Sequence, residues 1–275
     1  MNPSGMLGRV ARLYRSELTK AWRTKLPYVG LVASALMALV ARQSVEGLSR
    51  PGTITAPSYF AASVNMSTTI IVPIFATIFA AMLVAGETSR GTLRTILVRP
   101  VTRREFLTAK LLSGMTYLFL LMLANVVPAL VIASGYPAVA YADRGIGLPG
   151  PAQQVGIFAL ALALTLIPQA ATVCFGFFIS TLAPNVATAI GLAVGLLLSL
   201  EPIKQFVRFG AFELETWLFT SYYDTAIGIA DSKASGIYEV WGQWKVWMLL
   251  GTSLVSSLVF LAVAYRVFAR RDLNA

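Results

Sequence analysis

Between Arg144 and Glu201 the chain has 56 consecutive residues without a charged side chain, and this stretch limits the possible folds more than any other. A single helix of that length would be about 84 Å long, far longer than the ~30 Å hydrocarbon core of a bilayer. Two spans fit if the chain breaks between them. Pro184 lacks an N–H and disfavours helix at Ala183, and Asn185 suits a turn. We therefore predict two membrane-spanning helices here, separated at residues 183–185.

The remaining charges also occur in blocks that separate apolar stretches. Only 12% of the residues are charged and 57% are hydrophobic, whereas soluble domains carry about 25% charged residues. A span needs about 20 apolar residues, and a charge at its centre costs about 2.5–3.5 kcal/mol. Four further spans are predicted, at residues 26–41 (extended back through Ala21 and Trp22), near Tyr59–Ala85, near Leu111–Ser134 and at Val246–Tyr265. The sequence therefore predicts an all-α integral membrane protein with six spans.

The distribution of basic residues predicts the orientation of these spans. With the N-terminus inside, the inner segments hold 15 Lys and Arg residues and the outer segments hold 7. The net charges are then +11 inside and −1 outside. Because cytoplasmic loops are enriched in Lys and Arg, we expect both termini in the cytoplasm. This asymmetry accounts for the overall charge of +10 without nucleic acid as a partner.

The residue types present exclude several kinds of chemistry. The chain has no histidine, which removes histidine general bases, Ser-His-Asp triads and His-ligated metals. It has one cysteine, Cys174, in an apolar run, so an internal disulfide is impossible and we interpret the residue as part of the core. The sequence has no GxxxxGK[ST] phosphate-binding loop, so it is not expected to hydrolyse ATP by that route.

Two segments lie outside the predicted spans. Residues 1–25 are polar and basic, unlike a cleaved signal peptide, and predict an amphipathic helix in the membrane interface. Its apolar stripe is Leu7, Val10, Ala11, Tyr14, Leu18, Ala21 and Trp22. This helix is expected either to anchor the chain or to dock a partner. Residues 201–245 are rich in aromatic side chains and predict short helices that rest on the outer surface or dip back into the protein. Residues 26–275 are thus expected to form a single membrane domain.

The loop at residues 86–110 carries eight of the chain's charged residues, six basic and two acidic. Within it, Leu93, Ile96 and Leu97 have helical spacing, which predicts a short helix over residues 92–98 that ends before Pro100. Thr102 and Glu105 then fit a capping box at the start of the third span's helix. A short helix with an apolar face and adjacent arginines is suited to docking a soluble partner in the cytoplasm.

This loop resembles the permease subunit of the ABC type-2 transporters. The residues that carry the resemblance are Glu87, Gly91-Thr92-Leu93, Pro100, Arg103 and Lys110. The resemblance implies that two permease subunits, identical or related, pair and that two separate cytoplasmic ATPases bind below them. ATP and Mg would be bound by those ATPases, and the loop helix would couple their motion to the spans. Export across a cell membrane, most often bacterial, is the implied activity.

The resemblance also suggests which residues contact the ATPase. Arginines would pair with carboxylates on it, apolar residues would fill a groove on it, and Glu87 would hold the loop by pairing with Arg90 or Arg94. The expected coupling residues are Glu87, Arg90, Gly91, Leu93, Arg94, Ile96, Leu97, Pro100, Arg103 and Arg104.

Further candidate residues lie inside the spans. Small residues recur every four positions in the fifth span, and such a stripe lets helices approach closely, either within one bundle or between two permeases. These residues are Ala187, Gly191, Gly195 and Ser199. Few span residues are ionisable, which favours an amphipathic or lipid-like cargo over a small ion. Residues that could line the path are Thr68, Thr69, Thr77 and Asn125.

Two other kinds of protein fit the same composition. A membrane enzyme would have to use carboxylates of the outer segments, and a scaffold or sensor subunit would use the loop without moving cargo. The carboxylates available to such an enzyme are Asp143, Glu201, Glu213, Glu215, Asp224 and Asp231.

Overall fold

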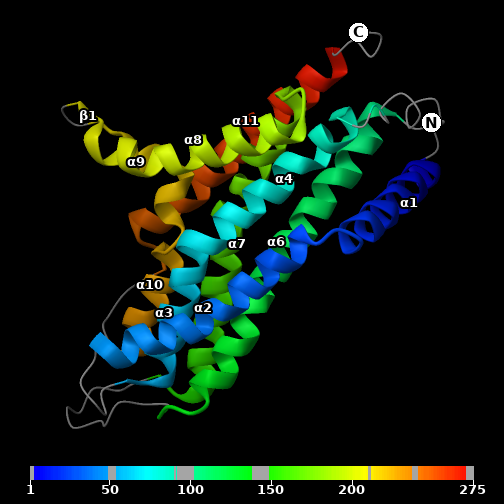
Figure 1. Ribbon diagram of the computed structural model, residues 1–275. Helices are drawn as coiled ribbons and strands as arrows, with labels where there is room; N and C mark the ends of the chain where they lie inside the picture. The colour runs from blue at the N-terminus through cyan, green and yellow to red at the C-terminus, as the bar shows by residue number, and fades with distance from the viewer. Residues whose placement is uncertain are drawn as a thin grey trace.

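The computed structural model describes residues 3–48, 54–89, 91, 102–137, 149–209, 212–236 and 241–270. In this part of the chain, helices form an elongated bundle, and one pair of two-residue strands lies at its edge (Figure 1). In chain order the elements are α1 (Pro3–Trp22), α2 (Leu26–Leu48), α3 (Ala56–Met66), the π-helix η1 (Ser67–Ile71), α4 (Val72–Ser89), α6 (Arg103–Ala133), α7 (Pro151–Leu182), α8 (Val186–Phe206), β1 (Arg208–Phe209), β2 (Phe212–Glu213), α9 (Leu214–Trp217), the 3₁₀-helix η2 (Phe219–Tyr222), α10 (Thr225–Ala234) and α11 (Trp244–Arg270).

The described residues contain six helical segments long and apolar enough to cross a membrane, which confirms the predicted fold class. They are Leu26–Gly47, Ala56–Ser89, Arg103–Ala133, Pro151–Leu182, Val186–Lys204 and Trp244–Arg270. The break between the fourth and fifth spans lies where Pro184 predicts it. Asn185 caps α8 there, because its side-chain oxygen accepts a hydrogen bond from the Thr188 N–H at 2.9 Å.

Several helices run beyond the predicted apolar stretches. The third span shows why: α6 begins at Arg103 because Thr102 caps it. The Thr102 hydroxyl accepts from the Glu105 N–H at 3.2 Å, and the Glu105 carboxylate accepts from the Thr102 N–H at 2.8 Å. This confirms the predicted capping box. The helix therefore starts eight residues before the apolar stretch that begins at Leu111.

Helices α4 and α7 pack closely against each other. A Cβ atom added to Gly176 would lie 2.9 Å from the Thr77 carbonyl oxygen, so only glycine fits at this crossing. One turn further along α7, the buried Ser180 hydroxyl donates to the Ala81 carbonyl at 2.6 Å and accepts from the Val84 and Ala85 N–H groups. These contacts hold the last turns of α4 firmly against α7.

The second span contains the π-helix η1, and Pro73 after it explains why Gln169 binds a backbone carbonyl there. In η1 the Val72 N–H bonds to the Ser67 carbonyl, five residues back. In the same register the next residue, Pro73, would bond to the Thr68 carbonyl, but proline has no N–H. The buried Gln169 side chain on α7 donates to that carbonyl at 2.6 Å instead. Gln169 thus satisfies a carbonyl in the middle of the bundle.

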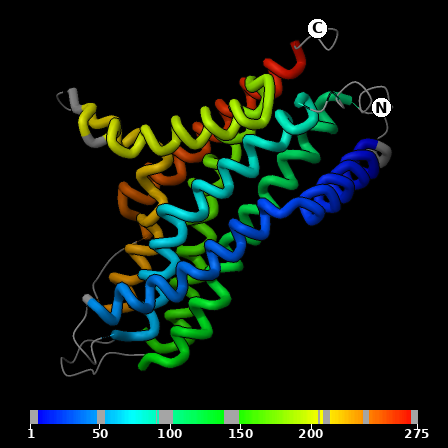
Figure 2. The backbone as a smooth tube through the Cα atoms, viewed as in Figure 1, coloured from blue at the N-terminus to red at the C-terminus, as the bar shows by residue number. Residues whose placement is uncertain are grey.

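The fifth span diverges from the other helices, and the chain after it returns along the bundle (Figures 1 and 2). The segment that includes η2 and Tyr223 lies deep along α7, because the buried Tyr223 hydroxyl and the Thr172 hydroxyl are 2.6 Å apart. Thr172 lies ten residues before the end of α7, or about 15 Å from it. Helix α10 then packs against α7 and α3. Residues 219–234 therefore dip back into the protein, one of the two arrangements that the sequence left open.

Candidate functional site

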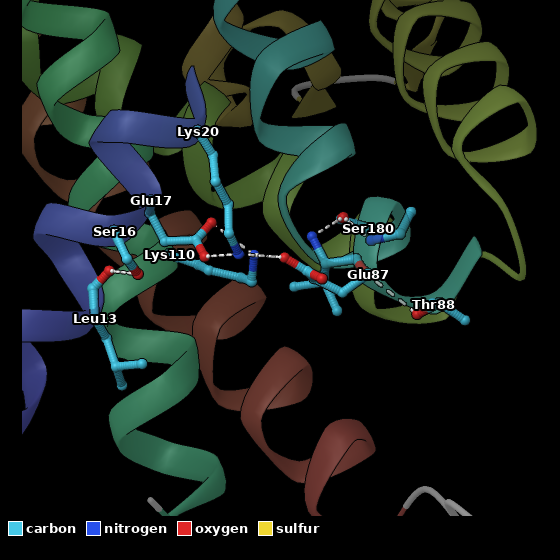
Figure 3. A network of polar contacts seen from close by, with 10 residues as sticks. Leu13, Ser16, Glu17, Lys20, Glu87, Thr88, Lys110 and Ser180 are labelled. Carbon is cyan, nitrogen blue, oxygen red and sulfur yellow. Dashed lines mark hydrogen bonds and ion pairs between the residues drawn. The ribbon is translucent and has the colours of Figure 1, made fainter. Parts of the chain in front are cut away.

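Four charged side chains from three helices form a closed ring of ion pairs at one end of the bundle (Figure 3). Glu17 and Lys20 come from α1, Glu87 from the last turn of α4, and Lys110 from the second turn of α6. Lys20 Nζ lies 2.8 Å from a Glu17 oxygen and 2.7 Å from Glu87 Oε1. Lys110 Nζ lies 2.7 Å from the other Glu17 oxygen and 3.4 Å from Glu87 Oε1. Each charge thus contacts two of opposite sign, and the ring is neutral. We call these four residues the charge ring.

Most of the charge ring is shielded from solvent. The side chains of Lys110, Glu87 and Glu17 are 2%, 9% and 10% exposed, whereas Lys20 is 48% exposed. Burial lowers the pKa of Lys20, but its hydrogen bonds to Glu17 and Glu87 outweigh this and raise the pKa above its usual value. Losing one partner from such a buried cluster costs about 3–5 kcal/mol, because a buried charge remains without compensation. The ring therefore ties α1, α4 and α6 together strongly.

A second set of contacts joins α1 to α6. Arg9 binds a Glu105 oxygen through Nε at 2.9 Å and Nη2 at 2.8 Å. The same carboxylate completes the capping box of α6, so one buried side chain serves both helices. The Tyr14 and Thr116 hydroxyls are 2.6 Å apart. The interfacial helix is therefore fixed to the start of the third span at three levels, by Arg9, Tyr14 and Glu17.

A small cavity adjoins the charge ring. It has a volume of about 110 Å³ and is lined by residues of α1, α2, α4, α6 and α8. The ring residues line one part of it, and the buried Ser113 hydroxyl, which has no hydrogen-bond partner among the described residues, lines another. The cavity brings the first residue of α8, Val186, next to the ring. Four of the six spans thus meet at this point.

The structure describes only part of the predicted coupling loop. Glu87, Gly91, Arg103 and Arg104 are placed, and the predicted helix over residues 92–98 lies outside the described residues, together with Arg90, Leu93, Arg94, Ile96, Leu97 and Pro100. Glu87 pairs with Lys20 and Lys110, two partners that the sequence analysis did not predict. Gly91 has a φ of +65°, a backbone conformation that favours glycine, and its N–H bonds to the Thr88 carbonyl just beyond α4.

Arg103 has a specific place in the described structure. Its Nη1 donates to the Phe268 carbonyl at 3.0 Å and to the Ala269 carbonyl at 2.8 Å, at the end of α11. It therefore caps the last span, in addition to any contact with a partner. Arg104 is exposed and lines a groove between α6 and α11.

The stripe of small residues on α8 faces away from its own bundle. Ala187, Gly191, Gly195 and Ser199 are all exposed, and open space surrounds both glycines. The buried face of α8 consists of Ala189, Ala193 and Leu197. Among the described residues, the stripe therefore does not pack within its own bundle, which was the first of its two interpretations.

The candidate path residues occupy different environments. Asn125 is buried, and its amide donates to the Ser34 carbonyl at 3.1 Å and the Ser63 hydroxyl at 3.3 Å, which links α6 to α2 and α3. Thr68 is buried and donates to its own helix, and Thr77 is buried at the α4–α7 crossing. Thr69 is the exposed member of the set.

The outer carboxylates form no metal site in the described part of the chain. No group of three or more Cys, Asp and Glu residues suited to a metal ion occurs there. Glu201 pairs with Lys204 at 2.7 Å on its own helix, and Asp143 lies outside the described residues.

Three members of this site were not predicted from the sequence: Arg9, Glu17 and Lys20. A signal was present for Glu17, which lies three positions after Tyr14 and seven after Val10, on the apolar stripe of α1. A charged residue on the apolar face of a helix indicates a buried polar partner. Nothing in the sequence, however, shows which residues provide it.

A search of curated proteins found no match to this chain. A family profile described as ABC-2 family transporter protein matches residues 13–199, which include the charge ring, the coupling loop, the first four spans and most of the fifth. This match extends over more than half of the chain. The protein is therefore a multi-pass membrane protein that belongs to the ABC-2 transporter permease family.

Proposed function

We propose that this chain is the permease subunit of an ATP-driven exporter in the cell membrane of a bacterium. Two permease subunits would pair to form the path, and two cytoplasmic ATPases, which bind ATP and Mg, would drive it. The family already implies association with ABC ATPase components. The asymmetry of basic residues supports a cytoplasmic location for both termini and for the loop after α4.

The charge ring is the observation that carries the proposal. Glu87 and Lys110 lie at the two ends of the 86–110 loop, in α4 and α6, so their ion pair joins those ends. Glu17 and Lys20 connect both residues to α1. A force that an ATPase applies to the loop would therefore reach α1, α4 and α6 together. Such a rigid base is what a loop needs if it is to transmit motion to several spans.

The first test is copurification of the tagged chain with its ATPase in mild detergent, from its native host. The loop variant is Arg90→Glu/Arg94→Glu, and the matched control is Arg12→Glu/Arg15→Glu, which reverses two exposed charges on α1. We expect a subunit with a phosphate-binding loop to copurify with wild type and control and to be lost from the loop variant. If no such subunit accompanies the wild-type chain, the proposal is wrong.

The pairing of two permeases has its own test, because Cys174 is buried and does not interfere with crosslinking. Gly195→Cys lies on the exposed stripe of α8, and Ala193→Cys on the buried face of the same helix is the control. We expect a disulfide-linked dimer from the Gly195 variant alone. Absence of that dimer under oxidising conditions, with the ATPase bound, would contradict a pair arranged about α8.

The cargo is proposed to be amphipathic or lipid-like. The polar side chains of the spans are mostly hydroxyls and amides, and Asn125 and Gln169 are engaged within the bundle. In the described residues, the charged side chains buried at the span ends are paired: the neutral ring and the Arg9–Glu105 pair lie at one end, and Lys204 pairs with Glu201 at the end of the fifth span. A path of this composition has little to offer a small ion. Transport of a labelled phospholipid by the reconstituted complex tests the idea, with a monovalent cation as the control.

A further inference from the structure

A basic groove lies between the start of α6 and the end of α11. Its volume is about 420 Å³, and its lining includes Arg103 and Arg104 from α6 together with Arg266 and Arg270 from α11. We call it the arginine groove. Its two walls are held in place by the Arg103 cap on α11, and the Thr108 and Tyr265 hydroxyls are 2.8 Å apart beside it. The groove is thus a fixed feature of the α6–α11 contact.

The arginine groove has an excess of positive charge. No carboxylate is among its described lining residues, and Arg104, Arg266 and Arg270 form no ion pair with any described residue. Arg266 and Arg270 are four residues apart on one helix, a spacing at which like charges repel. A guanidinium group presents a planar fork of donors that matches phosphate oxygens. An anionic phosphate would therefore relieve the repulsion and satisfy the arginines.

An apolar groove continues from the basic one along α11. It has a volume of about 370 Å³ and is lined by Ala262, Val263, Arg266, Val267 and Arg270. Three of these residues, Ala262, Arg266 and Arg270, line both grooves. Ala262 and Val263 are exposed on a span, where acyl chains surround the protein. The combined site therefore offers phosphate-binding groups at a span end and an apolar face of α11 beside them, further along the span.

We propose that the arginine groove binds the headgroup of an anionic phospholipid and that the adjoining apolar groove holds one of its acyl chains. A basic pocket between spans at the cytoplasmic membrane surface is a recurrent setting for anionic lipid headgroups. A free phosphate ion or the carboxylates of a partner protein would use the basic part alone. The lipid uses both parts, which is why the observations favour it. The proposal requires only that the chain spans a membrane, so it stands apart from the export function.

The test measures binding of single lipids to the delipidated full-length chain in detergent, by native mass spectrometry, without an ATPase. The probes are dioleoyl phosphatidylglycerol and dioleoyl phosphatidylcholine. The groove variant is Arg104→Gln/Arg266→Gln/Arg270→Gln, and the control is Arg12→Gln/Arg15→Gln/Arg23→Gln, which removes the same charge from two exposed positions on α1 and one just after it. We expect phosphatidylglycerol to bind the groove variant at least about tenfold more weakly than wild type, with phosphatidylcholine binding unchanged. The control should bind both lipids as wild type does.

A second variant tests the apolar part without changing charge. Ala262→Trp fills the wall that the two grooves share, and it should weaken phosphatidylglycerol binding several-fold while the arginines remain. Inorganic phosphate at equal concentration should not displace the lipid from the wild-type chain. The proposal is overturned if the groove variant binds phosphatidylglycerol as wild type does, or if the α1 control loses as much binding. It is also overturned if phosphate displaces the lipid or if Ala262→Trp has no effect on lipid binding. Either outcome would mean that the groove binds a simple anion or a partner protein through its basic part alone.

Discussion

Two sets of charged residues near the same end of the bundle are arranged in opposite ways. In the charge ring, two lysines and two glutamates alternate, and Lys110 is almost fully buried. In the arginine groove, Arg104, Arg266 and Arg270 are exposed and have no ion-pair partner among the described side chains. Both sets lie in segments that the sequence predicts to be inside, yet the ring is neutral and stabilises this chain, whereas the groove has an excess of positive charge that is available to a ligand.

This difference indicates that the basic residues of the segments predicted to lie inside do not all have the same function. The orientation of the spans depends only on where the basic residues lie along the chain, so exposed and buried basic residues would set it equally well. The ring adds a structural function because carboxylates accompany its lysines at the helix ends. The groove lacks carboxylates among its described residues, so its charge remains to attract an anion. Removing residues from each set should separate these functions.

The largest effect is expected for Lys110→Met. This change leaves Glu17 and Glu87 close together and nearly buried, with Lys20 as their remaining partner in the ring. Removal of one partner from a buried ion pair costs about 3–5 kcal/mol in the free energy of unfolding. Chemical unfolding in detergent micelles measures it. Lys25→Met, at an exposed position just before α2, is the matched control and should change stability by less than about 0.5 kcal/mol. Equal effects of the two substitutions would show that the ring is not a stabilising unit.

A smaller effect is expected for Glu87→Gln. The amide oxygen can still accept a hydrogen bond, but the charge that faces Lys20 and Lys110 is lost, and such charged hydrogen bonds contribute about 1.5–3 kcal/mol. Because Glu17 still contacts both lysines, the ring would be weakened rather than lost. The double variant Glu87→Gln/Lys110→Met should cost less than the sum of the single changes, by about 0.5–3 kcal/mol. If the changes in unfolding free energy in this double-mutant cycle were strictly additive, the ring residues would not be coupled.

Most of the fold could be predicted from the sequence, but the ring could not. Charge-free stretches predict spans because burial of a charge in a bilayer is costly, and Pro184 and Thr102 mark helix ends through local backbone chemistry. The pairing of Glu87 with Lys20, by contrast, depends on where α1 lies against α6. That placement is set by tertiary contacts such as Tyr14 with Thr116, which leave no periodic pattern in the sequence. The stripe of small residues on α8 is evident in the sequence, but the sequence does not show that the stripe faces away from its own bundle.

A still smaller effect is expected for Arg103→Gln. This change removes the hydrogen bonds to the Phe268 and Ala269 carbonyls and a positive charge at the C-terminal end of α11, which together contribute about 1 kcal/mol. Arg104→Gln is the matched control, because the Arg104 side chain makes no such contact among the described residues, and this change should leave the unfolding free energy within about 0.5 kcal/mol of wild type.

The comparison of Arg103 with Arg104 matters for studies of ATPase docking. Reversal of Arg103 would disturb the α6–α11 contact, so a resulting loss of ATPase would not by itself identify a docking residue.

The smallest effect is expected for the triple change Arg104→Gln/Arg266→Gln/Arg270→Gln in detergent without anionic lipid. Repulsion between Arg266 and Arg270 at four-residue spacing costs about 0.2–0.5 kcal/mol, and the favourable interaction of these cations with the end of α11 is of similar size and opposite sign. The two contributions nearly cancel, so the free energy of unfolding should stay within about 0.5 kcal/mol of wild type. Addition of phosphatidylglycerol should then stabilise the wild-type chain more than the triple variant, because a ligand that binds more weakly adds less stability by mass action. A large loss of stability without lipid would mean that these arginines have a structural function as the ring does, and the contrast between the two regions would disappear.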